Sequence, residues 1–212
     1  NNDAKVLSTW LVDGDDVWIE YFEPQKVAGQ GNFTIKKVVH GYRTQNLFAN
    51  EKGLNSSGAC NHDVDCTIDE DIEGLKNHLK KGVAILLVGN SGFCSGSLIN
   101  NARNDQKPYI LTARHCGFDT PYCAFRFNWI SPNPVCAAYQ NSTNGHTTQT
   151  ISGGQSRASR QQSDFHLVEI NNPIPESWDV VWNGWDNTDA IPTKTFGIHH
   201  PSGDIMKVCV DR

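Results

Sequence analysis

From residue 83 onwards the sequence is a series of short apolar runs separated by turn residues, and this pattern limits the fold more than any other feature. The runs that we expect to be strands span residues 83–88, 93–99, 107–112, 122–130 and 164–170. Short strands with short connections and almost no helix predict an all-β fold built around an antiparallel barrel. Residues 178–185, 193–199 and 204–210 look like the first strands of a second barrel. The polar stretch from 140 to about 154 is expected to be an exposed surface hairpin.

The N-terminal 52 residues are expected to form a separate β-rich segment. Val17–Phe22 alternates after a turn, and Phe33–Val39 is a second candidate strand. Because a lone two-stranded ribbon is marginal in water, this segment must pack on something or belong to a larger domain. A carbohydrate-binding or adhesive β-module is one interpretation.

Between this segment and the barrel lie a linker and a short helix. Gln45–Ser57 is polar and is typical of a linker, and Ile68–Lys81 is expected to contain a helix with Ile72, Leu75 and Leu79 on one face. The predicted divisions are therefore 1–52, 53–170 for the first barrel and 171–212 for the start of the second.

Composition favours a secreted protein. Seven cysteines in 212 residues are many for a cytosolic protein and predict disulfides. A net charge of −5 gives no reason to expect nucleic acid or acidic lipid as a partner. No apolar run reaches the roughly 18 residues of a membrane span. The chain opens Asn1-Asn2-Asp3 without a secretion signal, so we expect either that the signal was removed or that this is an internal piece.

The residues with the clearest chemical meaning are His115, which follows an apolar run, and Asp164, which precedes one. A hydroxyl nucleophile is nearly inert at neutral pH and needs an adjacent base such as imidazole. A carboxylate that accepts the other imidazole N–H would fix the tautomer and stabilise the imidazolium. From the residues alone, Asp105 or Asp119 could also serve as that carboxylate.

Several segments, in their order along the chain, resemble the trypsin-like peptidases and most closely the bacterial lysyl endopeptidases. The resemblance covers roughly Lys52 to Arg212 and rests on Gly58-Ala59-Cys60-Asn61 through Cys66, Gly96-Ser97-Leu98-Ile99-Asn100-Asn101, Asn104-Asp105, Tyr109-Ile110-Leu111-Thr112-Ala113 with His115-Cys116-Gly117, Ser163-Asp164-Phe165, Trp182-Asn183-Gly184-Trp185-Asp186 and Ile198-His199-His200-Pro201. It implies a chymotrypsin-like double β-barrel and a secreted, extracellular bacterial serine endopeptidase that acts on proteins or peptides. In this family His115 would be the base and Asp164 its orienting carboxylate. The motif Cys94-Ser95-Gly96-Ser97 would be a strand of the first barrel and not the nucleophile.

The resemblance also implies how the cysteines pair. Cys94–Cys116 and Cys66–Cys136 are the expected disulfides, and Cys60 would pair with a cysteine beyond Arg212. Cys123 and Cys209 have no family counterpart and remain candidates to pair with each other.

The third triad member would be a serine in a Gly-x-Ser-Gly pattern, and no such pattern occurs after His115 up to Arg212. We therefore expect a precursor fragment that is inactive alone and whose partner is the C-terminal part of the same protein. Residues 1–52 would be a propeptide, cut at Lys52-Gly53. Cleavage of substrates after lysine is implied by the family only.

Two other interpretations remain open. A non-catalytic relative could keep the barrel as a binding or adhesive module. His199-His200 near Asp204, and His62 between Cys60 and Cys66, suggest a metal only superficially, because no His-Glu-x-x-His pattern occurs and the cysteines are expected in disulfides. We expect no metal and no cofactor.

Overall fold

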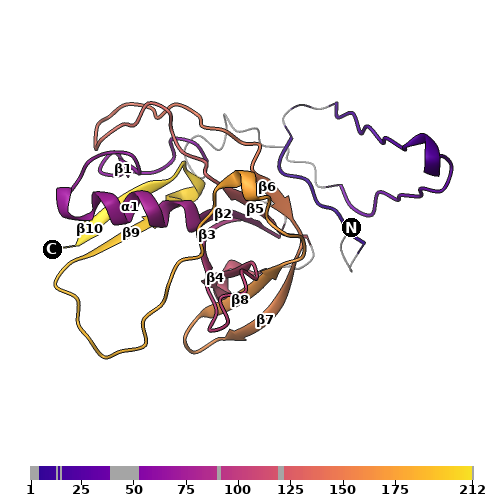
Figure 1. Ribbon diagram of the computed structural model, residues 1–212. Coiled ribbons are helices and arrows are strands. Elements are labelled where there is room, and N and C mark those ends of the chain that lie inside the picture. Colours follow the sequence, from indigo (N-terminus) through magenta and orange to yellow (C-terminus); the bar gives the residue numbers. More distant parts are fainter. Residues whose placement is uncertain are drawn as a thin grey trace.

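A seven-stranded antiparallel sheet forms the larger part of the molecule (Figure 1). The computed structural model describes residues 5–12, 14, 16–38, 53–89, 92–118 and 122–211. The sheet order is β6-β5-β2-β3-β4-β8-β7. Its strands are β2 (Val83–Val88), β3 (Gly92–Ile99), β4 (Tyr109–Ala113), β5 (Ala124–Phe127), β6 (Thr150–Ser152), β7 (Gly154–Arg160) and β8 (Phe165–Ile170). The prediction of an all-β fold is confirmed.

The two ends of this sheet are joined by one bent segment. Gly153 alone separates β6, which pairs with β5, from β7, which pairs with β8. Its φ of +83° is a conformation that favours glycine. The Gly153 N–H donates to the Cys123 carbonyl (2.8 Å), and its carbonyl accepts from the Asn171 N–H (3.1 Å). The corner therefore curls the sheet into a barrel, as closure removes open edges.

Strands β6 and β7 arise partly from the stretch that was predicted to be an exposed hairpin, so that expectation was wrong. Residues 140–149 form no strand, and Ser142 is buried. The pattern missed β7 because its side chains after Gly154 are polar and exposed, whereas the strand is held by backbone pairing with β8.

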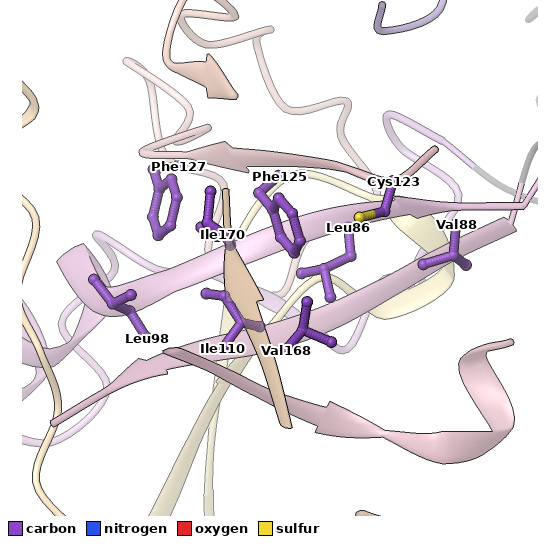
Figure 2. Packing of buried hydrophobic residues seen from close by; sticks show 10 residues of the cluster. Leu86, Val88, Leu98, Ile110, Cys123, Phe125, Phe127, Val168 and Ile170 are labelled. Carbon is purple, nitrogen blue, oxygen red and sulfur yellow. The ribbon is translucent and has the colours of Figure 1, made fainter. Parts of the chain in front are cut away.

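The barrel interior is a single apolar cluster (Figure 2). It consists of Ala84, Leu86, Val88, Leu98, Ile110, Cys123, Phe125, Phe127, Val168 and Ile170. Strand β2 is buried along its whole length, since its even-numbered side chains face this cluster while Val83 and Ile85 pack in two other clusters. Strand β2 therefore packs against the barrel interior on one face and towards the second sheet on the other.

The second sheet has three strands in the order β1-β10-β9. They are β1 (His62–Asp63), β9 (Thr195–His199) and β10 (Lys207–Asp211). Two of the three strands predicted after residue 171 are thus present. Residues 178–185 form no strand, because a 3-10 helix, Glu176–Trp178, is followed by a chain that reaches the barrel only through the bridge of Ile99 with Asn183.

The predicted helix is present but its buried face differs. Helix α1 (Glu73–Leu79) lies between 3-10 turns at Glu70–Ile72 and Lys80–Gly82. Ile72 is buried, but Leu75 is 54% exposed and Lys76 is fully buried. The Lys76 ammonium donates to the Cys66 carbonyl (2.6 Å) and to Glu73 (2.8 Å), which compensates for its burial.

The remaining 3-10 helices are Gln25–Val27, Arg114–Cys116 and Pro201–Gly203. In the described part of residues 5–38 there is no strand, so the predicted strands at Val17–Phe22 and Phe33–Val39 are not formed, although Val39 lies outside the described residues. Instead, Glu23 accepts backbone N–H groups from a loop, and the Tyr21 and Phe33 rings lie 5.2 Å apart. No helix within the described ranges is long and apolar enough to cross a membrane.

Candidate active site

Strand pairing brings His115 and Asp164 together. His115 lies in the 3-10 turn directly after β4, and Asp164 directly precedes β8. Because β4 and β8 are antiparallel neighbours with Ala113 opposite Phe165, the end of one strand meets the start of the other. Two residues 49 positions apart thereby become adjacent.

Three hydrogen bonds connect the turn to Asp164. His115 Nδ1 lies 2.5 Å from Asp164 Oδ2, and the His115 backbone N–H donates to Asp164 Oδ1 (2.9 Å). The Arg114 N–H donates to the Asp164 carbonyl (2.8 Å). Asp164 has a φ of +51°, a conformation that aspartate tolerates better than most residues. Both carboxylate oxygens are therefore fixed on the imidazole side of the turn.

These contacts also set the electrostatics of the pair. The hydrogen bond from the His115 ring lowers the pKa of Asp164, and the backbone N–H groups of His115 and Arg114 lower it further. The carboxylate is thus an acceptor at neutral pH, and a tautomer of His115 with the proton on Nδ1 would donate to it and leave Nε2 as the free ring nitrogen. The His115 side chain is 73% exposed, which leaves most of the ring accessible from solvent.

Neighbouring groups hold the turn that carries His115. The Cys94–Cys116 disulfide, with Cα atoms 6.2 Å apart, attaches the turn to β3. Thr112 Oγ1 donates to the Ser95 carbonyl (2.9 Å), and Gly117 ends the turn in the left-handed conformation. The second predicted disulfide, Cys66–Cys136, is also present. Cys123 is in the barrel core and Cys209 is exposed on β10, so the possible bond between these two is not formed.

Comparison with known proteins gives this arrangement a family. The model of the lysyl endopeptidase C-terminal domain matches residues 54–212, which is most of the chain. The chain belongs to this family. A curated relative, the lysyl endopeptidase of Pseudomonas aeruginosa, is 23% identical over 206 residues. The match covers 93% of this chain and 44% of the relative, so the chain spans less than half of that protein's length.

In this member of the lysyl endopeptidase family, Ser95 and Ser97 have structural contacts. Ser95 Oγ accepts from the His200 backbone N–H (2.8 Å), and Ser97 Oγ accepts from the Asn183 side-chain amide (2.9 Å). The two hydroxyls thus connect β3 to Asn183, before β9, and to His200, directly after β9. These bonds fit the interpretation of this motif as a strand of the first barrel.

A second serine–histidine contact occurs two residues from Asp164. Ser156 Oγ lies 2.8 Å from His166 Nε2. His166 is buried, and its Nδ1 has no hydrogen-bond partner among the described residues. Burial, together with the nearby charge of Arg114, lowers the pKa of His166. Since no carboxylate of the described ranges bonds to this ring, the pair lacks the third element that the His115 site has.

The histidines considered as metal ligands lie in packed surroundings. His200 is buried, stacks on Trp129 and has its Nδ1 2.9 Å from the Asp204 carbonyl. Within the described ranges, the His/Cys groupings that could hold an ion are His62 with Cys66 and Cys136, and His115 with Cys94 and Cys116. The cysteines of both are joined in disulfides, so they are not thiolate ligands.

The structure also contains an ionic network that the sequence analysis missed. Lys207 Nζ lies 2.6 Å from Asp63 and 3.6 Å from Asp204, and all three residues are buried. Asp204 accepts from the Asn55 N–H (2.6 Å) and the Ser57 N–H (3.2 Å). The sequence offered only the alternation of side chains along the short strand that contains Lys207. That alternation does not tell whether a charged residue such as Lys207 faces the interior or the solvent.

Of the predicted cleavage site, Lys52 lies outside the described residues. Gly53 is described, and its N–H donates to the Ser202 carbonyl (2.9 Å). Asp119, one of the alternative carboxylates, is also outside the described residues. The other, Asp105, is held by the Asn101 side chain (2.5 Å) and the Lys107 N–H (3.2 Å) in a different loop.

Proposed function

We propose that this chain carries the general base and the orienting carboxylate of a secreted, trypsin-like serine endopeptidase. The observation that supports the proposal most is the paired contact of Asp164 with both the ring and the backbone N–H of His115. Membership of the lysyl endopeptidase family supports a peptidase-related function independently. A binding or adhesive module would have no need of an accessible imidazole held by a carboxylate.

In the proposed reaction His115 Nε2 accepts the proton of a serine hydroxyl while the serine oxygen attacks the substrate carbonyl. Asp164 keeps the proton on Nδ1 and stabilises the imidazolium that forms. His115 then gives the proton to the leaving amine, and the peptide bond breaks to leave an acyl-enzyme. A water molecule, deprotonated by His115, hydrolyses this ester and restores the serine. Backbone N–H groups near the serine would stabilise the oxyanion.

We place the serine in a Gly-x-Ser-Gly sequence encoded after residue 212, as the family order suggests. The 212 residues alone are then expected to be inactive. Cleavage after lysine is supported by the name of the curated relative, a lysyl endopeptidase. Activation at Lys52-Gly53 is supported by the start of the family match at residue 54. Two disulfides fit secretion into an oxidising, extracellular compartment.

The decisive experiment uses the protein expressed from its whole gene. Hydrolysis of fluorogenic peptides with lysine, arginine or leucine before the scissile bond should favour lysine. His115→Ala should lower kcat/KM by roughly 10⁴-fold or more. His78→Ala is the matched control, because His78 is exposed on α1 and should leave activity unchanged. N-terminal sequencing of the same active enzyme should begin at Gly53.

Three results would count against the proposal. The gene could lack a Gly-x-Ser-Gly sequence after residue 212, or His115→Ala could hydrolyse peptides as fast as the unmodified enzyme. Either result would favour the non-catalytic binding relative. A mature N-terminus outside residues 45–60 would remove the activation site only, leaving the catalytic assignment intact.

A further inference from the structure

The N-terminal segment contacts the barrel through one short stretch. Val6, Ser8 and Trp10 are partly buried, whereas the odd-numbered residues between them are exposed. This period of two is typical of an extended chain with one side against a surface. Ser8 Oγ also donates to the Cys123 carbonyl (3.2 Å), next to β5. Residues 6–10 therefore lie on the barrel like an added peptide.

Trp10 provides the main side-chain contact of this stretch. The Arg126 guanidinium carbon lies 4.0 Å from the centre of the Trp10 ring, and the Phe93 ring lies 6.1 Å from it. Trp10 packs against the cluster formed by Ile85, Trp129 and Ile205. These residues come from β2, from β3, from β5 and its following loop, and from the connection between β9 and β10, so the indole lies where the barrel meets the second sheet.

Arg126 is a buried cation, and two indole rings, those of Trp10 and Trp129, lie against its guanidinium. Its Nε donates to Thr150 Oγ1 (3.0 Å). In addition to the contact with Trp10, its guanidinium carbon lies 5.9 Å from the centre of the Trp129 ring. Among the ion pairs between described residues, none includes Arg126. Burial lowers the pKa of Arg126 to about 10, so the group stays charged at neutral pH. A planar guanidinium in such a place is well suited to hold an indole face.

Beyond residue 10 the described part of the segment is almost entirely exposed. Trp18 is 96% exposed and Phe22 is 80% exposed, although both are as apolar as the residues that anchor the segment. The segment is therefore attached to the barrel by specific contacts at residues 6–10 and not by the apolar character of its side chains in general. Trp18 provides a natural comparison for Trp10, since it has the same side chain in the same segment.

We propose that Phe93, Arg126 and Trp129 form a binding site for an aromatic side chain of an extended peptide, occupied here by Trp10. This site holds the N-terminal segment on the barrel even when the connection between them is cut. The class of ligand is a short extended peptide with one aromatic residue. The N-terminal segment of this chain is one such ligand. The contact involves neither His115 nor Asp164, and the inference stands or fails independently of the peptidase assignment.

The test is to cut the full chain and to ask whether its two parts stay together. A recognition sequence for a site-specific protease is introduced into the polar linker 45–52, the purified protein is nicked, and the product is analysed by size-exclusion chromatography. The N-terminal fragment should co-elute with the barrel in the otherwise unmodified protein and in Trp18→Ala. In Trp10→Ala its retention should be at least about tenfold weaker, as loss of a partly desolvated cation–π contact predicts.

A second measurement leaves the barrel unchanged. A synthetic peptide of residues 5–12, added in excess to the nicked protein, should release the N-terminal fragment, while the same peptide with Ala in place of Trp10 should not. Separation of the fragment from the nicked protein without any substitution would overturn the inference. Equal retention in Trp10→Ala and Trp18→Ala would overturn it as well, because the site would then not depend on the indole at position 10.

Discussion

Lys207 is a buried cation that connects stretches of chain far apart in the sequence. Besides Asp63 and Asp204, its ammonium lies 3.0 Å from Ser142 Oγ. The second Asp63 oxygen accepts the Val135 N–H (2.7 Å). One charged group thus holds β1 near the start of the family match, the long loop before β6 and the second sheet in one arrangement. Buried charges of this kind are tolerated because each has several hydrogen-bond partners.

Replacing Lys207 by methionine should destabilise the protein strongly. The variant would leave the carboxylates of Asp63 and Asp204 buried without their cation, which typically costs about 3–5 kcal/mol. Lys81→Met is the control, because Lys81 is paired with the exposed Asp179 and surface pairs contribute about 1 kcal/mol or less. Urea unfolding of both variants measures the difference. Equal midpoints would show that the network contributes no more than a surface pair.

At the scale of elements, the barrel depends on close contact between strands. Gly96 on β3 faces the interior, where a Cβ atom would lie 2.7 Å from Ile110 Cγ2 and 3.0 Å from Leu86. Its two serine neighbours bond elsewhere: Ser95 to the N–H of His200, directly after β9, and Ser97 to the Asn183 side chain in the irregular chain before β9. The Cys-Ser-Gly-Ser sequence is therefore explained by packing on both faces of one strand.

Gly96→Ala should cost roughly 1–3 kcal/mol, because a methyl group would be forced into a filled core. Gly184→Ala is the matched substitution, since a Cβ there has no neighbour within 4 Å. Thermal unfolding should show a clear fall in Tm for the first variant and almost none for the second. A Gly96→Ala protein as stable as Gly184→Ala would mean that β3 and β4 can move apart at little cost.

At the scale of the whole molecule, the contact between the barrel and the second sheet contains a group that responds to pH. The pKa of His200 is lowered to about 4, mainly by burial and also by the nearby charges of His199 and Arg126, while the hydrogen bond to the Asp204 carbonyl opposes the shift. The unfolded chain takes up this proton near pH 6.5 and the folded chain only near pH 4. Between these values the unfolded state binds more protons, so the free energy of unfolding falls as the pH falls.

The loss from pH 6.5 to 4 attributable to His200 should reach at most about 3 kcal/mol. Burial also lowers the pKa of His166 and His199, so these residues act in the same direction. His200→Asn, which retains a donor for the Asp204 carbonyl, should therefore show a smaller but not zero slope of stability against pH. Urea titrations at several pH values measure the slope. The same slope in both proteins would place the proton uptake elsewhere.

The sequence by itself determined the all-β class, five barrel strands, the two disulfides implied by the family and the residues that we propose as base and carboxylate. These are local patterns: apolar runs between turn residues, and short motifs next to them. The family resemblance rested on the order of these motifs along the chain. Such features are readable because each depends on neighbours within a few positions along the chain.

Only the tertiary structure decided the rest. β7 has polar side chains and is held by backbone pairing, so its sequence resembled a loop. The buried position of Lys76 was missed because the apolar residues of its helix suggested a different buried face. Trp10 and Trp18 could not be told apart from the sequence. What separates these residues is the surface that each one meets, and that surface is assembled from strands distant in sequence. The chain specifies it through the closed barrel as a whole and not through any local pattern.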